Sequence, residues 1–156
     1  MNACEILVQN LIQRNYMISA AESCTGGLFA SRIVSIPDAS KVLSASFVTY
    51  SEQAKNKFAF VPFDTIEKFG VVSEETAIAM ARGAAENAGA QVGVGITGYA
   101  GPSGGDKFAP KGTVYFGFFI NGEEHTERIF IADKTRNMIR EFSVRFAIKK
   151  LNELLE

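Results

Sequence analysis

One serine in the first quarter of the chain, Ser23, has the surroundings of a nucleophile that attacks a carbonyl group. It follows a short apolar run, residues 16–21, and precedes Thr25, Gly26 and Gly27, which open a second periodic segment. This order predicts a buried strand, a turn and a helix, with the serine at the carboxyl end of the strand, where ligands bind in open α/β folds. Backbone amides of the turn could point at an anion, so these three residues are predicted to contact the substrate.

A serine hydroxyl needs a base before it can act as a nucleophile near neutral pH. The single histidine, His125, lies beside two glutamates after a predicted hairpin turn, and nothing in the pattern brings it near Ser23. A lysine is the natural alternative base. Lys55 is the candidate, because Tyr50 at a predicted strand end precedes it closely and could relay or orient a proton. Spacing alone leaves open that the two are a surface lysine and a half-buried sheet tyrosine.

Residues 98–105 form the densest glycine stretch in the chain and follow a predicted buried strand, residues 91–97. The length and glycine content of this loop favour contact with a ligand over a simple tight connection. It is not a Walker loop, because no Gly-Lys-Ser/Thr sequence follows it.

Helices and strands are predicted to alternate along the rest of the chain. Helical periodicity is found in residues 6–12, 51–58, 63–69 and 133–156, and Ser73 and Gly89 bound a further small-residue helix. Asp133 and Thr135 are the two candidate N-caps of the last helix. Strands are predicted at 42–50, 113–120 and 126–132, the last two joined by Asn121-Gly122, which suits a type I′ hairpin turn. The sequence therefore predicts a single three-layer α/β/α domain over residues 1–156, with a mixed sheet that includes an antiparallel hairpin.

Composition narrows the classes of partner. Hydrophobic residues make up 47% of the 156 residues, and 16 basic side chains face 17 acidic ones, so no basic field draws the chain to nucleic acid or an anionic membrane. Cys4 and Cys24 suggest neither a disulfide framework nor a zinc site. No apolar run approaches the roughly 20 residues that cross a bilayer. We expect a soluble, cytoplasmic protein without a metal site.

Five separated motifs together resemble the CinA C-terminal domain family. In chain order they are Ala-Glu-Ser-Cys-Thr-Gly-Gly (21–27), Val-Thr-Tyr-Ser with Ala-Lys (48–51, 54–55), Gly-Val-Val-Ser-Glu-Glu (70–75), Ile-Thr-Gly with the following glycine loop (96–105), and Gly-Thr-Val (112–114). The resemblance extends from about the first predicted helix to the last.

The resemblance implies an α/β/α amidohydrolase that converts nicotinamide mononucleotide to nicotinate mononucleotide and ammonia without a metal or an organic cofactor. Ser23 would be the nucleophile, Lys55 the base and Tyr50 its helper. Arg136, with Arg140 one turn on, would hold the phosphate. Residues expected to line the ligand site are Thr97, Gly98, Gly101, Gly104 and Gly105. A homodimer or higher homo-oligomer is also expected.

The chain departs from the family pattern mainly around the glycine loop. Tyr99 stands where a smaller aliphatic residue is common, and residues 109–112 read Ala-Pro-Lys-Gly where Lys-Pro-Val is usual. A third departure lies at residues 133–136, where the family usually has Gly-Asp-Arg. Two other functions stay open: a nucleotide-binding or regulatory module that lost the chemistry, and an amidase for another small amide. Cys24 could be a thiol nucleophile or a buried packing residue, and Glu22 a hydrogen-bond anchor for the turn or a general acid.

Overall fold

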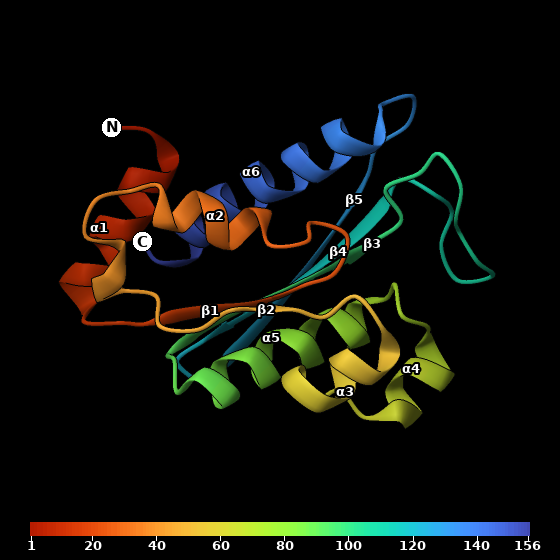
Figure 1. Ribbon diagram of the computed structural model, residues 1–156, viewed down its shortest axis with the longest axis horizontal. Helices are drawn as coiled ribbons and strands as arrows, with labels where there is room; N and C mark the ends of the chain where they lie inside the picture. Colours follow the sequence, from red (N-terminus) through yellow and green to blue (C-terminus); the bar gives the residue numbers. More distant parts are fainter.

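Five strands form one mixed sheet between two layers of helices in the computed structural model, which describes residues 1–156 (Figure 1). The strands are β1 (Ile18–Glu22), β2 (Phe47–Val48), β3 (Val92–Gly98), β4 (Thr113–Ile120) and β5 (Glu123–Phe130). The helices are α1 (Ala3–Arg14), α2 (Leu28–Val34), α3 (Glu52–Ala59), α4 (Phe63–Phe69), α5 (Glu74–Ala88) and α6 (Arg136–Leu154), with a 3₁₀ turn at Ala39–Lys41. The predicted single α/β domain with a mixed sheet is confirmed.

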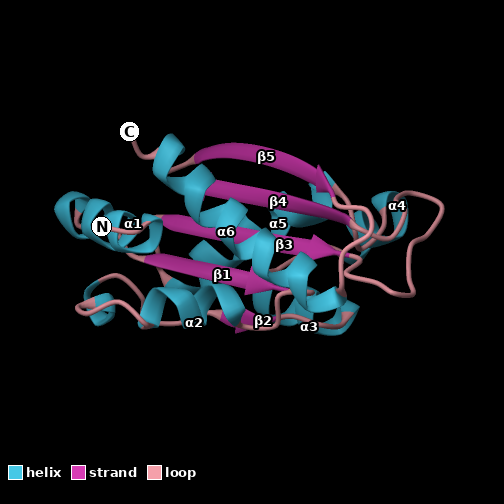
Figure 2. Cartoon of the chain, turned by 90° about the horizontal axis from the view of Figure 1, so that it is seen from above, coloured by secondary structure: helices cyan, strands magenta, loops and turns pink.

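The sheet has the order β2-β1-β3-β4-β5, visible from above in Figure 2. Strands β2, β1 and β3 are parallel, whereas β4 and β5 pair in antiparallel fashion. Strands β1 and β3 therefore end at the same edge of the sheet, and the long connection between β3 and β4 extends beyond that edge (Figures 1 and 2). Ligand sites of open α/β sheets occur at such an edge.

Helices α1, α2 and α6 cover one face of the sheet, and α3, α4 and α5 cover the other (Figure 1). The larger apolar core lies on the first face, where Leu7, Phe29 and Val144 pack with strand residues. On the second face α5 approaches the sheet closely: a Cβ at Gly95 would lie 2.1 Å from the Ala77 carbonyl oxygen. Only glycine permits that approach.

The predicted strand over residues 42–50 is wrong for most of its length. Only Phe47–Val48 pair with β1, and Leu43 forms an isolated bridge to Ile18. Between them, the Ser46 hydroxyl accepts a hydrogen bond from the Ala20 amide at 3.0 Å and donates one to the Ala20 carbonyl at 3.1 Å. The side chain thus replaces the ladder that a continuous strand would form with its own main chain.

The other boundary predictions hold within a few residues. Asn121 and Gly122 have φ angles of 47° and 95°, which confirms the type I′ hairpin turn, although β5 begins at Glu123 and ends at Phe130 rather than covering 126–132. Ser51 and Ser73 cap α3 and α5 with their side chains, and Gly89 ends α5. Of the two proposed caps for α6, Thr135 is the one used.

Candidate active site

A cavity of about 640 Å³ opens where β1 and β3 end. Its walls come from the turn after β1, the start of α3, the end of β3 with the loop that follows, the segment before α5, and the first residue of α6. Its polar lining residues are Ser23, Tyr50, Ser51, Glu52, Gln53, Lys55, Thr97, Tyr99, Ser103, Asp106 and Arg136. The volume lies in the usual range for a small-molecule site, about 300–1,000 Å³.

Ser23 and Lys55, predicted as a pair, lie within hydrogen-bond distance across this cavity. The Lys55 Nζ is 3.0 Å from the Ser23 Oγ and also donates to the Thr49 carbonyl oxygen at 2.7 Å. The capped start of α3 brings Lys55 one turn into the helix on its buried side, and only 2% of the residue is exposed. The two hydrogen bonds hold the Lys55 Nζ beside the Ser23 Oγ, and because the residue is buried, water does not readily replace them.

Burial of Lys55 lowers its pKa from 10.5 to about 8, against the opposing effects of Cys24 and Glu52. A lysine with this pKa has a neutral fraction of about one in ten at pH 7, compared with less than about one in a thousand for a free side chain. Lys55 can therefore accept a proton from Ser23 near neutral pH.

The turn that carries Ser23 is fixed by its own main chain. The Ser23 amide donates to the Ile96 carbonyl on β3 at 2.9 Å, and the Gly26 amide donates to the Ser23 carbonyl at 3.1 Å. Gly26 takes a φ of 55°, which a glycine adopts without strain. Cys24 lines the cavity, and its amide has no oxygen acceptor in the chain; its only partner is the weakly accepting sulfur of its own side chain.

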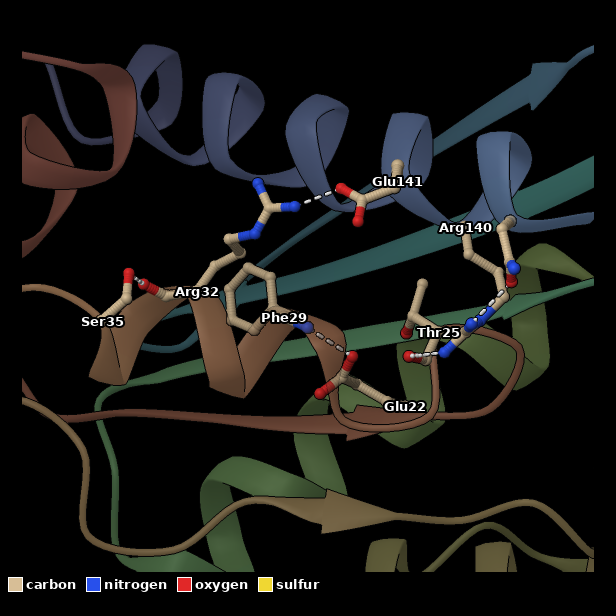
Figure 3. Close-up of polar contacts among 8 residues, drawn as sticks. Glu22, Thr25, Phe29, Arg32, Ser35, Arg140 and Glu141 are labelled. Carbon is tan, nitrogen blue, oxygen red and sulfur yellow. Dashed lines mark hydrogen bonds and ion pairs between the residues drawn. The ribbon is translucent and has the colours of Figure 1, made fainter.

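Glu22, immediately before the nucleophile, acts as a hydrogen-bond anchor for the turn. Its carboxylate is 1% exposed and accepts from the Phe29 amide at 2.8 Å and the Ala30 amide at 3.2 Å in the first turn of α2 (Figure 3). These two bonds join the end of β1 to the start of α2 across the serine. With both oxygens occupied in this way, the anchor interpretation is the one that the contacts favour over a general acid.

Cys24 is a buried thiol beside the nucleophile. Burial raises its pKa to about 11, with smaller opposing contributions from its own amide and from Arg140. A thiol with so high a pKa carries almost no thiolate at neutral pH and is a poor nucleophile. The structure therefore favours Ser23 over its neighbour.

Tyr50 lies in the cavity wall but contacts Arg136 rather than Lys55. Its side chain is among the exposed large ones at 63%, and its hydroxyl accepts a hydrogen bond from Arg136 Nη2 at 3.0 Å. Arg136 Nη1 also donates to the Gly101 carbonyl at 2.9 Å. Tyr50 thus positions Arg136, and no hydrogen bond joins it to Lys55, the residue that it was predicted to help.

Only some of the predicted ligand residues after β3 line the cavity. Thr97 and Gly98 do, with the Thr97 hydroxyl held by the Val71 carbonyl at 2.7 Å. The glycines at 101, 104 and 105 do not; they take positive φ angles that shape the loop.

The side chains that the loop brings to the cavity instead are Tyr99, Ser103 and Asp106. The Tyr99 hydroxyl donates to Asp106 Oδ2 at 2.6 Å, and the Phe108 and Ala109 amides donate to Oδ1 at 2.7 and 2.9 Å. Partial burial raises the pKa of Asp106, but these hydrogen bonds outweigh it and hold the pKa below its usual value.

Four further predicted ligand residues lie outside the cavity lining. Thr25, Gly26 and Gly27 continue the turn behind Ser23, and Arg140 lies against that turn from α6 (Figure 3). Arg140 Nε donates to the Cys24 carbonyl at 2.9 Å and Nη2 to the Thr25 carbonyl at 3.1 Å. Direct contact of these residues with a substrate therefore has no support from the geometry.

The sequence did not single out Ser103, Asp106 or the Thr49 carbonyl as site groups. Tyr99 was visible as a departure from the family pattern, and its partner Asp106 is its nearest acidic neighbour in the sequence. A main-chain carbonyl leaves no sequence signal. His125 lies on β5, three strands away from β1, so it is remote from Ser23 as predicted.

No helix is long and apolar enough to span a bilayer, both cysteines are free thiols, and no group of three or more His, Cys, Asp or Glu side chains could hold a metal ion. Fold and site together define an α/β/α protein with a hydrogen-bonded serine–lysine pair, its lysine buried, at the carboxyl edge of a mixed sheet. The chain belongs to the CinA C-terminal domain family, whose model matches residues 2–155.

Known relatives agree with this membership. A CinA-like protein of Kosmotoga olearia is 46% identical over 144 residues, which is 92% of this chain but 35% of that protein, so the chain spans about a third of that relative's length. Protein YdeJ of Escherichia coli is 40% identical over 99% of this chain and 89% of its own length. A crystal structure of an Escherichia coli competence-damaged protein (CinA) superfamily member has a TM-score of 0.94 at 40% identity, covering 98% of this chain and 88% of that one.

Proposed function

We propose that this chain is an amidohydrolase that converts nicotinamide mononucleotide to nicotinate mononucleotide and ammonia, with Ser23 as nucleophile and Lys55 as base. The observation that carries the proposal is the 3.0 Å contact between the Lys55 Nζ and the Ser23 Oγ, made by a lysine whose burial lowers its pKa to about 8. A serine activated by a neutral amine is a recognised variant of the catalytic triad.

In the proposed reaction, neutral Lys55 takes the proton of the Ser23 hydroxyl as its oxygen bonds to the carboxamide carbon. The carbonyl oxygen becomes an oxyanion, and the donor that we assign to it is the amide of the lining residue Cys24, which has no oxygen acceptor in the chain. As the C–N bond breaks, the Lys55 ammonium gives this proton to the amide nitrogen, which leaves as ammonia, and Lys55 is neutral again.

Water then attacks the acyl-enzyme, with Lys55 taking a proton from the water and giving it to the Ser23 oxygen as the ester bond breaks. Each step uses a group already within reach of the cavity, and the balance of protons needs no metal or organic cofactor.

The nucleotide as substrate is supported by two groups of residues in the cavity. Ser23 and Lys55 form one hydrogen-bonded group in its lining, and Arg136, the first residue of α6, forms another with Tyr50. An arginine at a helix N-terminus combines paired donors with the positive end of the helix dipole, which suits a phosphate. Asp106 is an anion that could pair with the positively charged pyridinium ring.

An ammonia-release assay with a panel of amides tests this proposal. Nicotinamide mononucleotide should be hydrolysed with the highest kcat/KM, and nicotinamide riboside and nicotinamide, which lack the phosphate, should be poorer by at least about 100-fold, as expected when a charged recognition group loses its ligand. Equal rates with and without the phosphate would instead favour an amidase for another small amide.

A nucleotide-binding or regulatory module without chemistry is the second candidate, because two of the three nitrogens of Arg136 already have partners in the chain. Isothermal titration calorimetry separates the two functions. Tight binding of nicotinamide mononucleotide with no ammonia after hours would favour the module. The cytoplasmic location and the homodimer stay predictions.

A further inference from the structure

We propose that Arg140 is a positioning residue for the Ser23 turn and not a ligand for the substrate's phosphate. The proposal rests on the amide hydrolysis proposed above, because it concerns how the oxyanion site is held. Arg140 reaches from α6 to the main-chain oxygens of the two residues that follow the nucleophile. Its Nε donates to the Cys24 carbonyl at 2.9 Å and its Nη2 to the Thr25 carbonyl at 3.1 Å, and Figure 3 shows the contact with Thr25.

A hydrogen bond to each of these carbonyls holds the plane of the peptide group to which the carbonyl belongs. In a trans peptide the carbonyl and the following amide point in opposite directions, and the only cis peptide bond of the chain is Gly101-Pro102. The Thr25 carbonyl that Arg140 binds therefore shares its plane with the Gly26 amide. That amide donates to the Ser23 carbonyl at 3.1 Å.

The Ser23 carbonyl in turn shares its peptide plane with the Cys24 amide, which has no oxygen acceptor in the chain and whose only partner is the weakly accepting sulfur of its own side chain. Arg140 thus orients this amide through two peptide groups joined by one hydrogen bond. The N–H of the residue after a nucleophilic serine supplies part of the oxyanion hole in other hydrolases as well.

The side of the sheet from which Arg140 acts agrees with this role. Helix α6, which carries it, and α3, which carries Lys55, lie on opposite faces of the sheet (Figure 1). Arg140 is absent from the cavity lining, and its third nitrogen, Nη1, donates to Asn137 Oδ1 at 3.0 Å. All three guanidinium nitrogens thus have a partner within the protein.

Arg136, one helical turn earlier, provides the contrast. It lines the cavity and can meet a phosphate there, so its loss should weaken substrate binding. Loss of Arg140 should instead leave binding intact and slow the chemical step. The oxyanion forms only in the transition state, so a donor that is no longer aimed at it raises the barrier without weakening the binding of the substrate.

Steady-state kinetics with nicotinamide mononucleotide tests the difference. Arg140→Met should lower kcat about 10- to 100-fold with KM within about 3-fold of the wild-type value, a loss typical of a misplaced catalytic group. Arg136→Met should raise KM. Arg140→Lys, which keeps the charge but cannot span both carbonyls, should recover only part of kcat, and it also serves as the test variant if Arg140→Met does not fold.

Arg145→Met, on the exposed part of α6, is the matched control and should behave as wild type. Circular dichroism and melting temperatures check that each variant is folded. A raised KM with a preserved kcat in Arg140→Met would overturn the proposal and make Arg140 a phosphate ligand. Wild-type kinetics in that variant would overturn it as well.

Labelling with a fluorophosphonate probe tests the role of Arg140 independently of the identity of the substrate. The probe forms a tetrahedral adduct on an activated serine, so its phosphoryl oxygen uses the same oxyanion donor. Ser23 should be labelled in the wild type and at least about 10-fold more slowly in Arg140→Met, in line with a lost oxyanion contact. Equal labelling rates would overturn the role of Arg140 alone. Slower labelling together with no ammonia release from nicotinamide mononucleotide by the wild type would support that role and overturn the substrate.

Discussion

The two walls of the cavity are held in different ways. The catalytic wall, as we propose it, consists of the Ser23 turn and Lys55 on α3. Lys55 and Glu22 are buried in it, and Glu22, Arg140 and main-chain bonds brace it. The loop wall, residues 99–112 after β3, is largely exposed, and the contacts that hold it include the pair of Tyr99 and Asp106 and the hydrogen bond from Arg136 to the Gly101 carbonyl. Bond making needs atoms placed within a fraction of an ångström, whereas recognition tolerates variation on a loop.

The departures from the family pattern fall mainly on the loop wall, at Tyr99 and at residues 109–112. The difference between the walls therefore suggests that the chemistry and the choice of amide are carried by separable parts of the cavity. Substitutions in the catalytic wall should change kcat, and substitutions in the loop wall should change KM.

The largest effect is expected from removing the base. Lys55→Met should lower kcat by about 10⁴-fold or more, as for single members of other catalytic units, while the fold stays intact. Lys57→Met, on the exposed side of the same helix, is the matched control and should retain full ammonia release. Near-normal turnover by Lys55→Met would show that the wall with Ser23 and Lys55 does not carry the chemistry.

The buried lysine should also make stability depend on pH. The pKa of Lys55 is lower in the folded protein, about 8, than the 10.5 of a free side chain. Below pH 8 the folded state carries the full cost of a buried ammonium, and this cost disappears as pH rises to 10.5 because both states become neutral. Relative to Lys55→Met, the wild-type free energy of unfolding should therefore rise by up to about 3 kcal/mol over this range.

Urea denaturation of both proteins at pH 7.5 and pH 10.5 measures this difference. Groups other than Lys55 titrate in both proteins, so their contributions cancel in the comparison. A difference in unfolding free energy that stays constant between the two pH values would show that Lys55 is not desolvated as described.

The same pKa sets the acid limb of activity. Because only neutral Lys55 accepts the Ser23 proton, kcat/KM should fall tenfold per pH unit below about 8. At pH 6 the value should be about 100-fold below the plateau reached above pH 9, in line with the neutral fraction of the lysine. A flat profile between pH 6 and 8 would argue for another base.

The smallest effect is expected in the loop wall. Tyr99→Phe removes the hydrogen bond to Asp106 and should raise KM about 3- to 10-fold with kcat within about 2-fold, the worth of one partly exposed charge-assisted hydrogen bond. Tyr115→Phe on β4, outside the cavity lining, is the control. A loss of kcat in Tyr99→Phe larger than its change in KM would mean that the loop also positions the reacting groups.

The sequence predicted the catalytic wall better than the loop wall for a physical reason. Ser23 and Lys55 belong to regular elements, a strand end and a capped helix, whose periodicity and cap residues place side chains in advance. The loop has no periodicity, so its glycine content predicts ligand contact without indicating which residues reach the cavity, and glycines 101, 104 and 105 are not among the lining residues.

Tertiary contacts between distant segments also left no sequence signal. Arg140 shares a face of α6 with Arg136, and spacing cannot tell which of two arginines reaches a cavity and which reaches main-chain carbonyls. The same limit applies to the segment before β2, where the Ser46 side chain replaces a strand ladder.

Detection of the covalent intermediate tests the central claim most directly. The wild-type protein would be mixed with nicotinamide mononucleotide, quenched in acid within the first turnover and analysed by peptide mass spectrometry. The proposal predicts an acyl group from the substrate on Ser23, and neither adduct nor ammonia with Ser23→Ala. An acyl group on Cys24, or ammonia release by Ser23→Ala at the wild-type rate, would contradict it.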